Sequence, residues 1–156
     1  MEPDALAGTL ARRLVRAIAG RDGPGPVLFL ADSGDPLGEY LYRRLMEGGT
    51  EIVRDTSRPE DCRGVVLARL TPRRVCEIWA GACRDETGEA VFRALLAGRP
   101  VWTPQEGGFW TNLPRSGLGA QVRERLQALR RAGLELLPAE EVLRRAAGEE
   151  REGRGR

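Results

Sequence analysis

The 156-residue sequence predicts an α/β domain in which helices cover both faces of a parallel sheet. Short apolar runs of strand length alternate with helical patterns from residue 27 to residue 147. Two of these runs, 27–31 and 64–68, are apolar throughout, which is typical of central parallel strands that are buried on both faces. Hydrophobic residues make up 41% of the chain and charged residues 31%, which indicates a buried core beneath a charged surface.

Five strands are expected, and turn-forming residues bound them. The first follows Pro26 and ends before Asp32, and the last follows Gly133. The five ranges are 27–31, 50–53, 64–68, 101–103 and 134–137. Because strands that alternate with helices pair in parallel through right-handed crossovers, we expect a three-layer flavodoxin/Rossmann-like sheet over residues 27–148.

Helical patterns fill the intervals between the strands. Gly98 and Gly133 follow two of them directly, at the position where glycine commonly ends a helix. The expected helices are 39–48, 72–83, 87–97, 118–132 and 139–147. The segments 32–38 and 104–117 are expected to be loops at the carboxyl ends of strands, where ligands bind in sheets of this kind.

Residues 1–26 are expected to form a separate unit, an amphipathic helix followed by a linker rich in glycine and proline. Within the helix, 4–19, aliphatic residues recur every four positions: Leu6, Leu10, Leu14 and Ile18. Three docking surfaces stay open for this apolar stripe: its own domain, a neighbouring subunit and a partner protein. The flexible linker favours a surface outside its own domain. The charged tail 149–156 is expected to be disordered.

Composition excludes several kinds of chemistry. The chain has no histidine, and all 25 of its basic residues are arginine. Catalysis through an imidazole base, Schiff-base chemistry on lysine and a lysine-containing phosphate loop are therefore excluded. The net charge is only +2 and both signs are mixed along the chain, so we expect no nucleic-acid partner. The chain lacks a membrane-spanning apolar run and a secretory signal, which predicts a cytoplasmic protein.

The three cysteines do not form a metal-binding pattern. Cys62, Cys76 and Cys83 include no CxxC pair, and no histidine is available to complete a zinc site, so no metal is expected. Cys76 and Cys83 are seven positions apart, on one face of the helix expected over 72–83. We expect them to be small buried hydrophobic residues.

Two loops after strands could bind an anion. Ser33 and Gly34 lie in the turn after the first strand, ahead of a helix whose N-terminal amides attract negative charge. The alternative is a plain turn in which Ser33 or Asp35 caps that helix. Arg73 and Arg74 begin the helix after the third strand and could hold a phosphate. An exposed arginine pair without a ligand is the alternative there.

The loop 104–114 carries an unusual group of aromatic residues. Phe109 and Trp110 lie in it beside Asn112, and Trp102 immediately precedes it. Loops are usually polar, so these side chains predict the wall of a ligand site or a subunit contact. The alternative is that they fold back on the domain as a satellite cluster.

The second half of the chain resembles the flavin-dependent phosphopantothenoylcysteine decarboxylase family. The family motifs occur here, in order, as VVLARLTPRRVCEIWAG, Asp85, LLAGRPVWTP, FWTNLP and ERLQALRRAGLELLP, over about residues 64–138. The resemblance implies bound FMN used for redox chemistry or electron transfer. It implies that the phosphate and the isoalloxazine ring would contact residues from three loops: Ser33, Gly34, Thr71, Arg73, Arg74, Trp110 and Asn112. It also implies a homo-oligomer, with a trimer favoured.

Several positions depart from the family pattern, and these departures argue against decarboxylase activity. Thr71 stands where the family has serine, and Arg73 and Arg74 replace its asparagine and threonine. The family's catalytic histidine has no counterpart, so we do not expect decarboxylation, and no catalytic residue is assigned. The alternative function is a non-catalytic binding or scaffold protein that has lost the flavin. Its host would be a bacterial microcompartment or another assembly, because the helix 4–19 on a flexible linker is similar to packaging helices of microcompartments.

Overall fold

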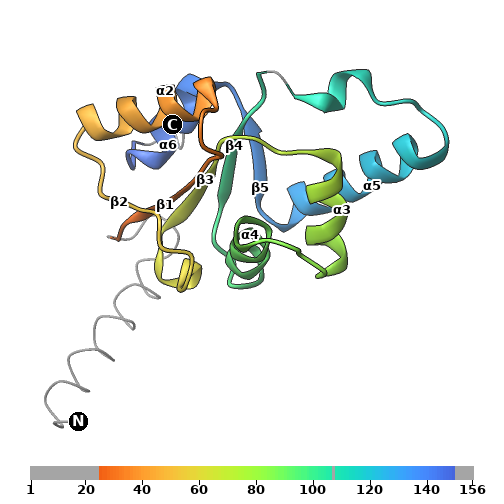
Figure 1. Cartoon of the computed structure of the whole chain (residues 1–156), viewed down its shortest axis with the longest axis horizontal. Helices are drawn as coiled ribbons and strands as arrows, with labels where there is room; N and C mark the ends of the chain where they lie inside the picture. The colour runs from red at the N-terminus through yellow and green to blue at the C-terminus, as the bar shows by residue number, and fades with distance from the viewer. Residues whose placement is uncertain (1–24, 107, 150–156) are drawn as a thin grey trace, which may run out of the picture.

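A computed structural model describes residues 25–106 and 108–149 of the chain (Figure 1). The helix expected over 4–19 and residues 150–156 of the tail lie outside this described part. Each expected strand and helix within it is present, and the boundaries differ by a few residues. All of these strands and helices lie within the range 27–148 that was expected to form the α/β domain.

Five strands form one sheet, in the order β2-β1-β3-β4-β5, and all four pairings are parallel. The strands are β1 (Val27–Leu30), β2 (Ile52–Val53), β3 (Gly64–Leu67), β4 (Val101–Pro104) and β5 (Leu134–Leu137). This topology confirms the prediction of a parallel α/β sheet. Its order is that of flavodoxin-like folds, in which the chain reverses its direction of winding between β1 and β3.

Helices connect the strands along the sheet. They are α2 (Pro36–Glu47), α3 (Pro72–Ala80), α4 (Glu86–Leu96), α5 (Gly117–Ala132) and α6 (Ala139–Ala146), with short 3-10 helices η2 (Pro59–Asp61) and η3 (Phe109–Asn112). Helix α2 begins three residues before the expected start at 39. Asp35 caps it and Pro36 occupies its first position, where the ring fits and no amide hydrogen is needed.

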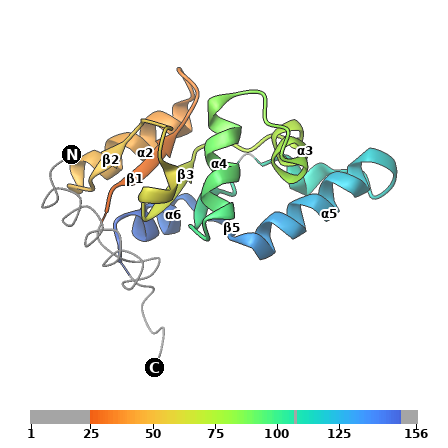
Figure 2. The ribbon, with the colours of Figure 1, turned by 90° about the horizontal axis from the view of Figure 1, so that it is seen from below.

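Two apolar clusters, one on each face of the sheet, produce three layers (Figures 1 and 2). Helices α2 and α6 cover one face, and α3, α4 and α5 cover the other. Successive residues of β1 alternate between the faces, so Phe29 contacts the α2/α6 cluster and Leu28 the opposite one. The three-layer arrangement with helices on both faces is confirmed.

Trp102 belongs to the core, although the sequence grouped it with the aromatic loop. It lies in β4, is 3% exposed, and packs with α2 and α6. Its indole ring lies directly over Gly64 on the neighbouring strand, so a Cβ atom at residue 64 would overlap the ring. Thr103, the next residue of β4, is fully buried, and its hydroxyl donates a 2.7 Å hydrogen bond to the Leu67 carbonyl oxygen.

The two cysteines expected on one helix face do not share a helix. Helix α3 ends at Ala80 because Gly81 adopts a left-handed conformation (φ 68°), and Cys83 lies in the following turn. Cys76 and Cys83 are both half-buried against the α3/α4/α5 side of the core, not fully buried as expected. Burial and nearby carboxylates raise the pKa of the Cys83 thiol, which keeps it protonated.

Among the described residues, no three cysteine or acidic side chains lie where they could hold a metal ion together. The helices of the described part are all too short or too polar to cross a membrane.

Candidate functional site

The strand order predicts a ligand site outside the carboxyl ends of β1 and β3. In open parallel sheets, ligands bind where the strand order reverses, and here that point lies between these two strands. Helix α2 packs closely over it, since a Cβ at Gly38 would lie 2.8 Å from the Cβ of Ala31 and 3.4 Å from that of Ala68. We call this place the β1/β3 crevice.

An ion pair occupies the β1/β3 crevice. Arg69, just after β3, donates two hydrogen bonds to Asp35: Nε to Oδ2 at 3.1 Å and Nη2 to Oδ1 at 3.0 Å. The Asp35 side chain is only 5% exposed, whereas that of Arg69 is 48% exposed. Hydrogen bonding from Arg69 holds the pKa of Asp35 below its ordinary value, although burial acts in the opposite direction. Asp35 is therefore ionised at neutral pH, with its charge directed at Arg69.

The helix N-termini at this edge of the sheet already have acceptors from the chain itself. Asp35 Oδ1 accepts a hydrogen bond from the Leu37 amide at the start of α2. The amide of Ala139, the first residue of α6, lies 2.9 and 3.1 Å from the two carboxylate oxygens of Glu106, which follows β4. Thr71 Oγ1 accepts from the Arg74 amide at the start of α3. An anion at α2 or α6 would therefore compete with a carboxylate that is already in place.

Four of the residues expected to bind flavin lie exposed at this edge. Ser33 and Gly34 form the turn after β1, and a Cβ at Gly34 would contact nothing within 4 Å. Gly34 has a positive φ of 83°, which favours glycine in this turn. Thr71 and Arg73 lie at the start of α3, after the neighbouring strand β3. The fold thus brings these two loops to one edge of the sheet, as the sequence predicts for parallel neighbours.

Arg74 has a structural partner. Its guanidinium donates a 2.7 Å hydrogen bond to the carboxylate of Asp85, and the Arg74 side chain is only 15% exposed. Asp85 in turn caps α4 by accepting from the Gly88 amide at 2.8 Å, and that bond lowers the pKa of Asp85. Arg74 therefore connects α3 to the beginning of α4. To bind a phosphate it would have to leave Asp85.

The aromatic loop folds back on the core. Phe109 and Trp110 are half-buried, pack edge-to-face with centroids 5.2 Å apart, and contact the α3/α4/α5 cluster together with Leu113. This is the satellite arrangement that the sequence left open as an alternative. Asn112, at the end of η3, is exposed.

Arg69 and Glu106 contribute to this edge of the sheet but were not predicted from the sequence. Arg69 lies 34 positions from Asp35, and Glu106 lies 33 positions from Ala139, so no local pattern connects either pair. A local signal did exist for Asp35, because an aspartate before proline at the start of a helix is typical of an N-cap.

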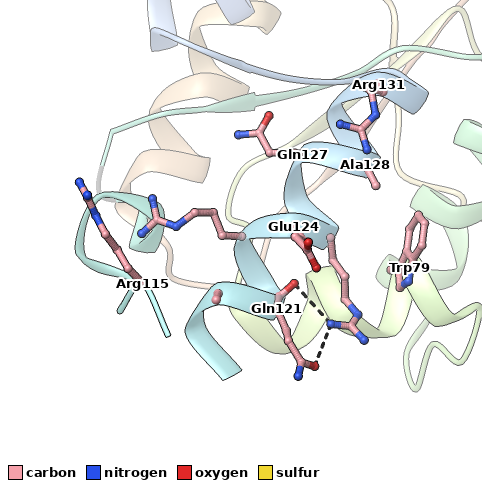
Figure 3. A pocket seen from close by; sticks show the side chains of 10 residues that line it. Trp79, Arg115, Gln121, Glu124, Gln127, Ala128 and Arg131 are labelled. Atoms are coloured by element: carbon pink, nitrogen blue, oxygen red, sulfur yellow. Dashed lines mark hydrogen bonds between the residues drawn. The ribbon is translucent and has the colours of Figure 1, made fainter. Parts of the chain in front are cut away.

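A second concave feature lies away from the strand ends. A hollow of about 1090 Å³ opens between α3 and α5, and Figure 3 shows its side chains. None of the seven residues predicted to bind flavin lines it.

Comparisons of the chain with protein-family models, with curated proteins and with solved structures found no match. The resemblance to the decarboxylase family stays a prediction.

Proposed function

We propose that this chain is a non-catalytic binding or scaffold protein built on a flavodoxin-like sheet. The observation that carries the proposal is the bidentate ion pair between Asp35 and Arg69 in the β1/β3 crevice. These two side chains are the charged groups best placed to contact a ligand there, and each is held by the other. If Arg69 turned to a bound ligand, the buried carboxylate of Asp35 would be left unpaired, which costs free energy.

The local charges support the same proposal. A phosphate at the start of α2 would have to replace Asp35 as the acceptor for the helix amides, with the carboxylate of Asp32 in the same turn. Like charges in such proximity repel. The chain also has no histidine or lysine that could act as an acid, base or nucleophile in the crevice.

FMN binding is the second candidate, and the strand order favours it. Flavodoxin, whose sheet has this order, binds FMN outside the ends of β1 and β3, and here the turn of Ser33 and Gly34 is exposed at the same edge as Thr71 and Arg73. These four residues would contact the phosphate, with Arg74 only after it leaves Asp85, and Trp110 and Asn112 would contact the ring. FMN would supply redox chemistry or electron transfer.

A flavin titration separates the two candidates. We expect the purified full chain to be colourless and its melting temperature to stay unchanged in saturating FMN. A ligand present at about 100 times its dissociation constant stabilises a protein by about 2.7 kcal/mol, so binding would raise the melting temperature by several degrees. A known FMN-binding flavodoxin, stripped of its flavin, is the positive control. Flavin absorbance that copurifies with the chain, or a thermal shift with added FMN, would contradict the scaffold proposal.

We also propose that the chain forms a homo-oligomer, with a trimer favoured, and that its host assembly is a bacterial microcompartment. The family resemblance supports the trimer, and the 72% exposed Leu118 at the start of α5 is an apolar side chain that a subunit contact would cover. Light scattering at micromolar concentration is expected to give three times the 17.1 kDa chain mass. A measured mass of one chain would contradict the proposed homo-oligomer. A mass of two chains would contradict the proposed trimer.

A further inference from the structure

The hollow between α3 and α5 concentrates positive charge. Four arginines line it, and the lining contains one acidic residue, Glu124 (Figure 3). The arginines are Arg115, Arg123, Arg125 and Arg131. The sequence predicted no concentrated basic face, because acidic and basic residues alternate along the chain. All four nevertheless line the same hollow, because Arg115 lies just before α5 and the other three lie on it.

Two of the four arginines are available to a partner. Arg123 Nη2 donates a 2.7 Å hydrogen bond to the Leu113 carbonyl oxygen, and Arg125 Nη1 lies 3.3 Å from two oxygens of Gln121. Arg115 and Arg131 are exposed, and within the described part of the chain neither has an ion pair. Their positive charge is therefore not neutralised by the domain itself.

The hollow also contains a large exposed aromatic side chain. Trp79, on α3, is 52% exposed and lies at the edge of the hollow opposite Arg115 (Figure 3). Ala120 and Ala128 add small apolar surface along α5. Tryptophan and arginine are among the residues most enriched in the hot spots of protein interfaces.

The shape of the hollow suits an elongated partner. Its lining on α5 extends from Ala120 to Arg131, which is about 16 Å along a helix axis. The hollow is open to solvent, so a small molecule in it would stay partly solvated, whereas a helix laid beside α5 would contact the full length of the lining.

The charge of the whole domain distinguishes a protein partner from a nucleic acid. The described residues contain 18 arginines and 18 acidic residues, so this part of the chain has no net charge. Domains that bind nucleic acid are usually strongly basic overall, and this domain is not. The chain's own terminal segments are also poor occupants, because residues 1–24 carry four arginines against three acidic residues.

We propose that the hollow between α3 and α5 docks an acidic amphipathic helix of a protein partner. Carboxylates of the partner would pair with Arg115 and Arg131, and an apolar side chain would cover Trp79. The proposal rests on the proposed binding function, and it names the chemistry of the partner.

Fluorescence anisotropy on the full chain tests this docking. The probe is a labelled amphipathic helical peptide of about 16 residues, or about 24 Å, with leucine on one face and glutamate on the other. The same peptide with glutamine in place of glutamate, and a single-stranded oligothymidine, are the comparison probes. We expect the acidic peptide to bind, with an affinity that falls as salt is added.

Matched variants locate the binding surface. The double variant Arg115→Glu/Arg131→Glu is expected to weaken binding of the acidic peptide by about tenfold or more. Arg130→Glu is the control, because Arg130 is exposed on the same helix and next in sequence to Arg131, but does not line the hollow. We expect it to change the affinity less than about twofold. Circular dichroism of each variant checks that the fold is retained.

Three results would overturn the proposal. They are no binding of the acidic peptide, an equal loss of affinity in Arg130→Glu, and tighter binding of oligothymidine that is lost in the double variant. The last result would identify a nucleic-acid surface. The FMN titration is independent of these three results. Bound FMN would overturn the scaffold proposal, whereas the peptide results test whether the hollow between α3 and α5 docks an acidic helix.

Discussion

Replacing Gly64 by alanine is expected to destabilise the folded protein by about 2 to 3 kcal/mol. Gly64 begins the central strand β3, and the added Cβ would overlap the indole ring of Trp102 on the paired strand β4. Trp102 is 3% exposed and packed between the sheet and helices α2 and α6, so its ring has no free space to enter. Urea unfolding at neutral pH measures the loss.

A double variant shows whether this overlap is the cause. Trp102→Leu alone is expected to cost about 3 kcal/mol because it leaves a cavity over Gly64. In Gly64→Ala/Trp102→Leu the new methyl group enters that cavity, so we expect the pair to cost clearly less than the sum of the two single variants. Gly48→Ala is the control, since Gly48 has an ordinary φ of −80° and a Cβ there would meet its nearest atom at 3.4 Å. Strict additivity of the two core changes would contradict the explanation.

The parallel sheet could be predicted because its signal is local. The strands β1 and β3 are apolar at every position, and turn residues such as Pro26 and Gly98 separate the elements. The errors are local as well. The expected start of α2 at 39 overlooked the cap formed by Asp35, and the helix expected to continue to residue 83 ends at Ala80 because Gly81 turns left-handed.

The candidate site could be predicted only in part, because its contacts join distant positions. The order of the strands brings Ser33 and Thr71 to one edge, and that much follows from a parallel sheet. The ion pair of Asp35 with Arg69 depends on how α2 lies over the ends of β1 and β3, which no spacing in the sequence reveals. The arginines of the α3/α5 hollow come from α5 and from the segment just before it, and only the fold places them and Trp79 of α3 around one hollow.

The crevice and the hollow assign different roles to arginine. Arg69 is paired with a buried carboxylate, and Arg74 connects two helices through Asp85, so both stabilise the domain. Arg115 and Arg131 are exposed and, in the part of the chain that the structure describes, have no acidic partner. In a chain whose cations are all arginine, an acidic partner marks the residues that stabilise the domain, and the docking role proposed for Arg115 and Arg131 requires that they have none.

Removing the carboxylate of Asp35 is expected to produce the second large loss of stability. Asp35→Ala removes the cap of α2, worth about 1 kcal/mol, and both hydrogen bonds from Arg69. Arg69 is half-exposed and regains water, so we expect a total of about 2 to 3 kcal/mol. Asp35→Asn keeps an oxygen that can cap the helix but loses the charge and one of the two oxygens that accept from Arg69, so its loss is expected to be smaller than that of Asp35→Ala.

The same ion pair makes stability depend on pH. The pKa of Asp35 in the folded protein lies below its ordinary value of 3.8, chiefly because Arg69 donates hydrogen bonds to the carboxylate. Its contribution is therefore complete above about pH 5, where the carboxyl is ionised in both the folded and the unfolded state, and is lost as the pH falls through the lower folded-state pKa. Urea unfolding of the natural chain and of Asp35→Asn should give a difference in the free energy of unfolding that is constant from pH 7 to about pH 5 and narrows below about pH 4.

Asp32→Asn, an exposed change in the same turn, is the control and should leave stability nearly unchanged at pH 7. If the difference in unfolding free energy between the natural chain and Asp35→Asn stayed unchanged at the lowest pH, the ion pair could not be its source.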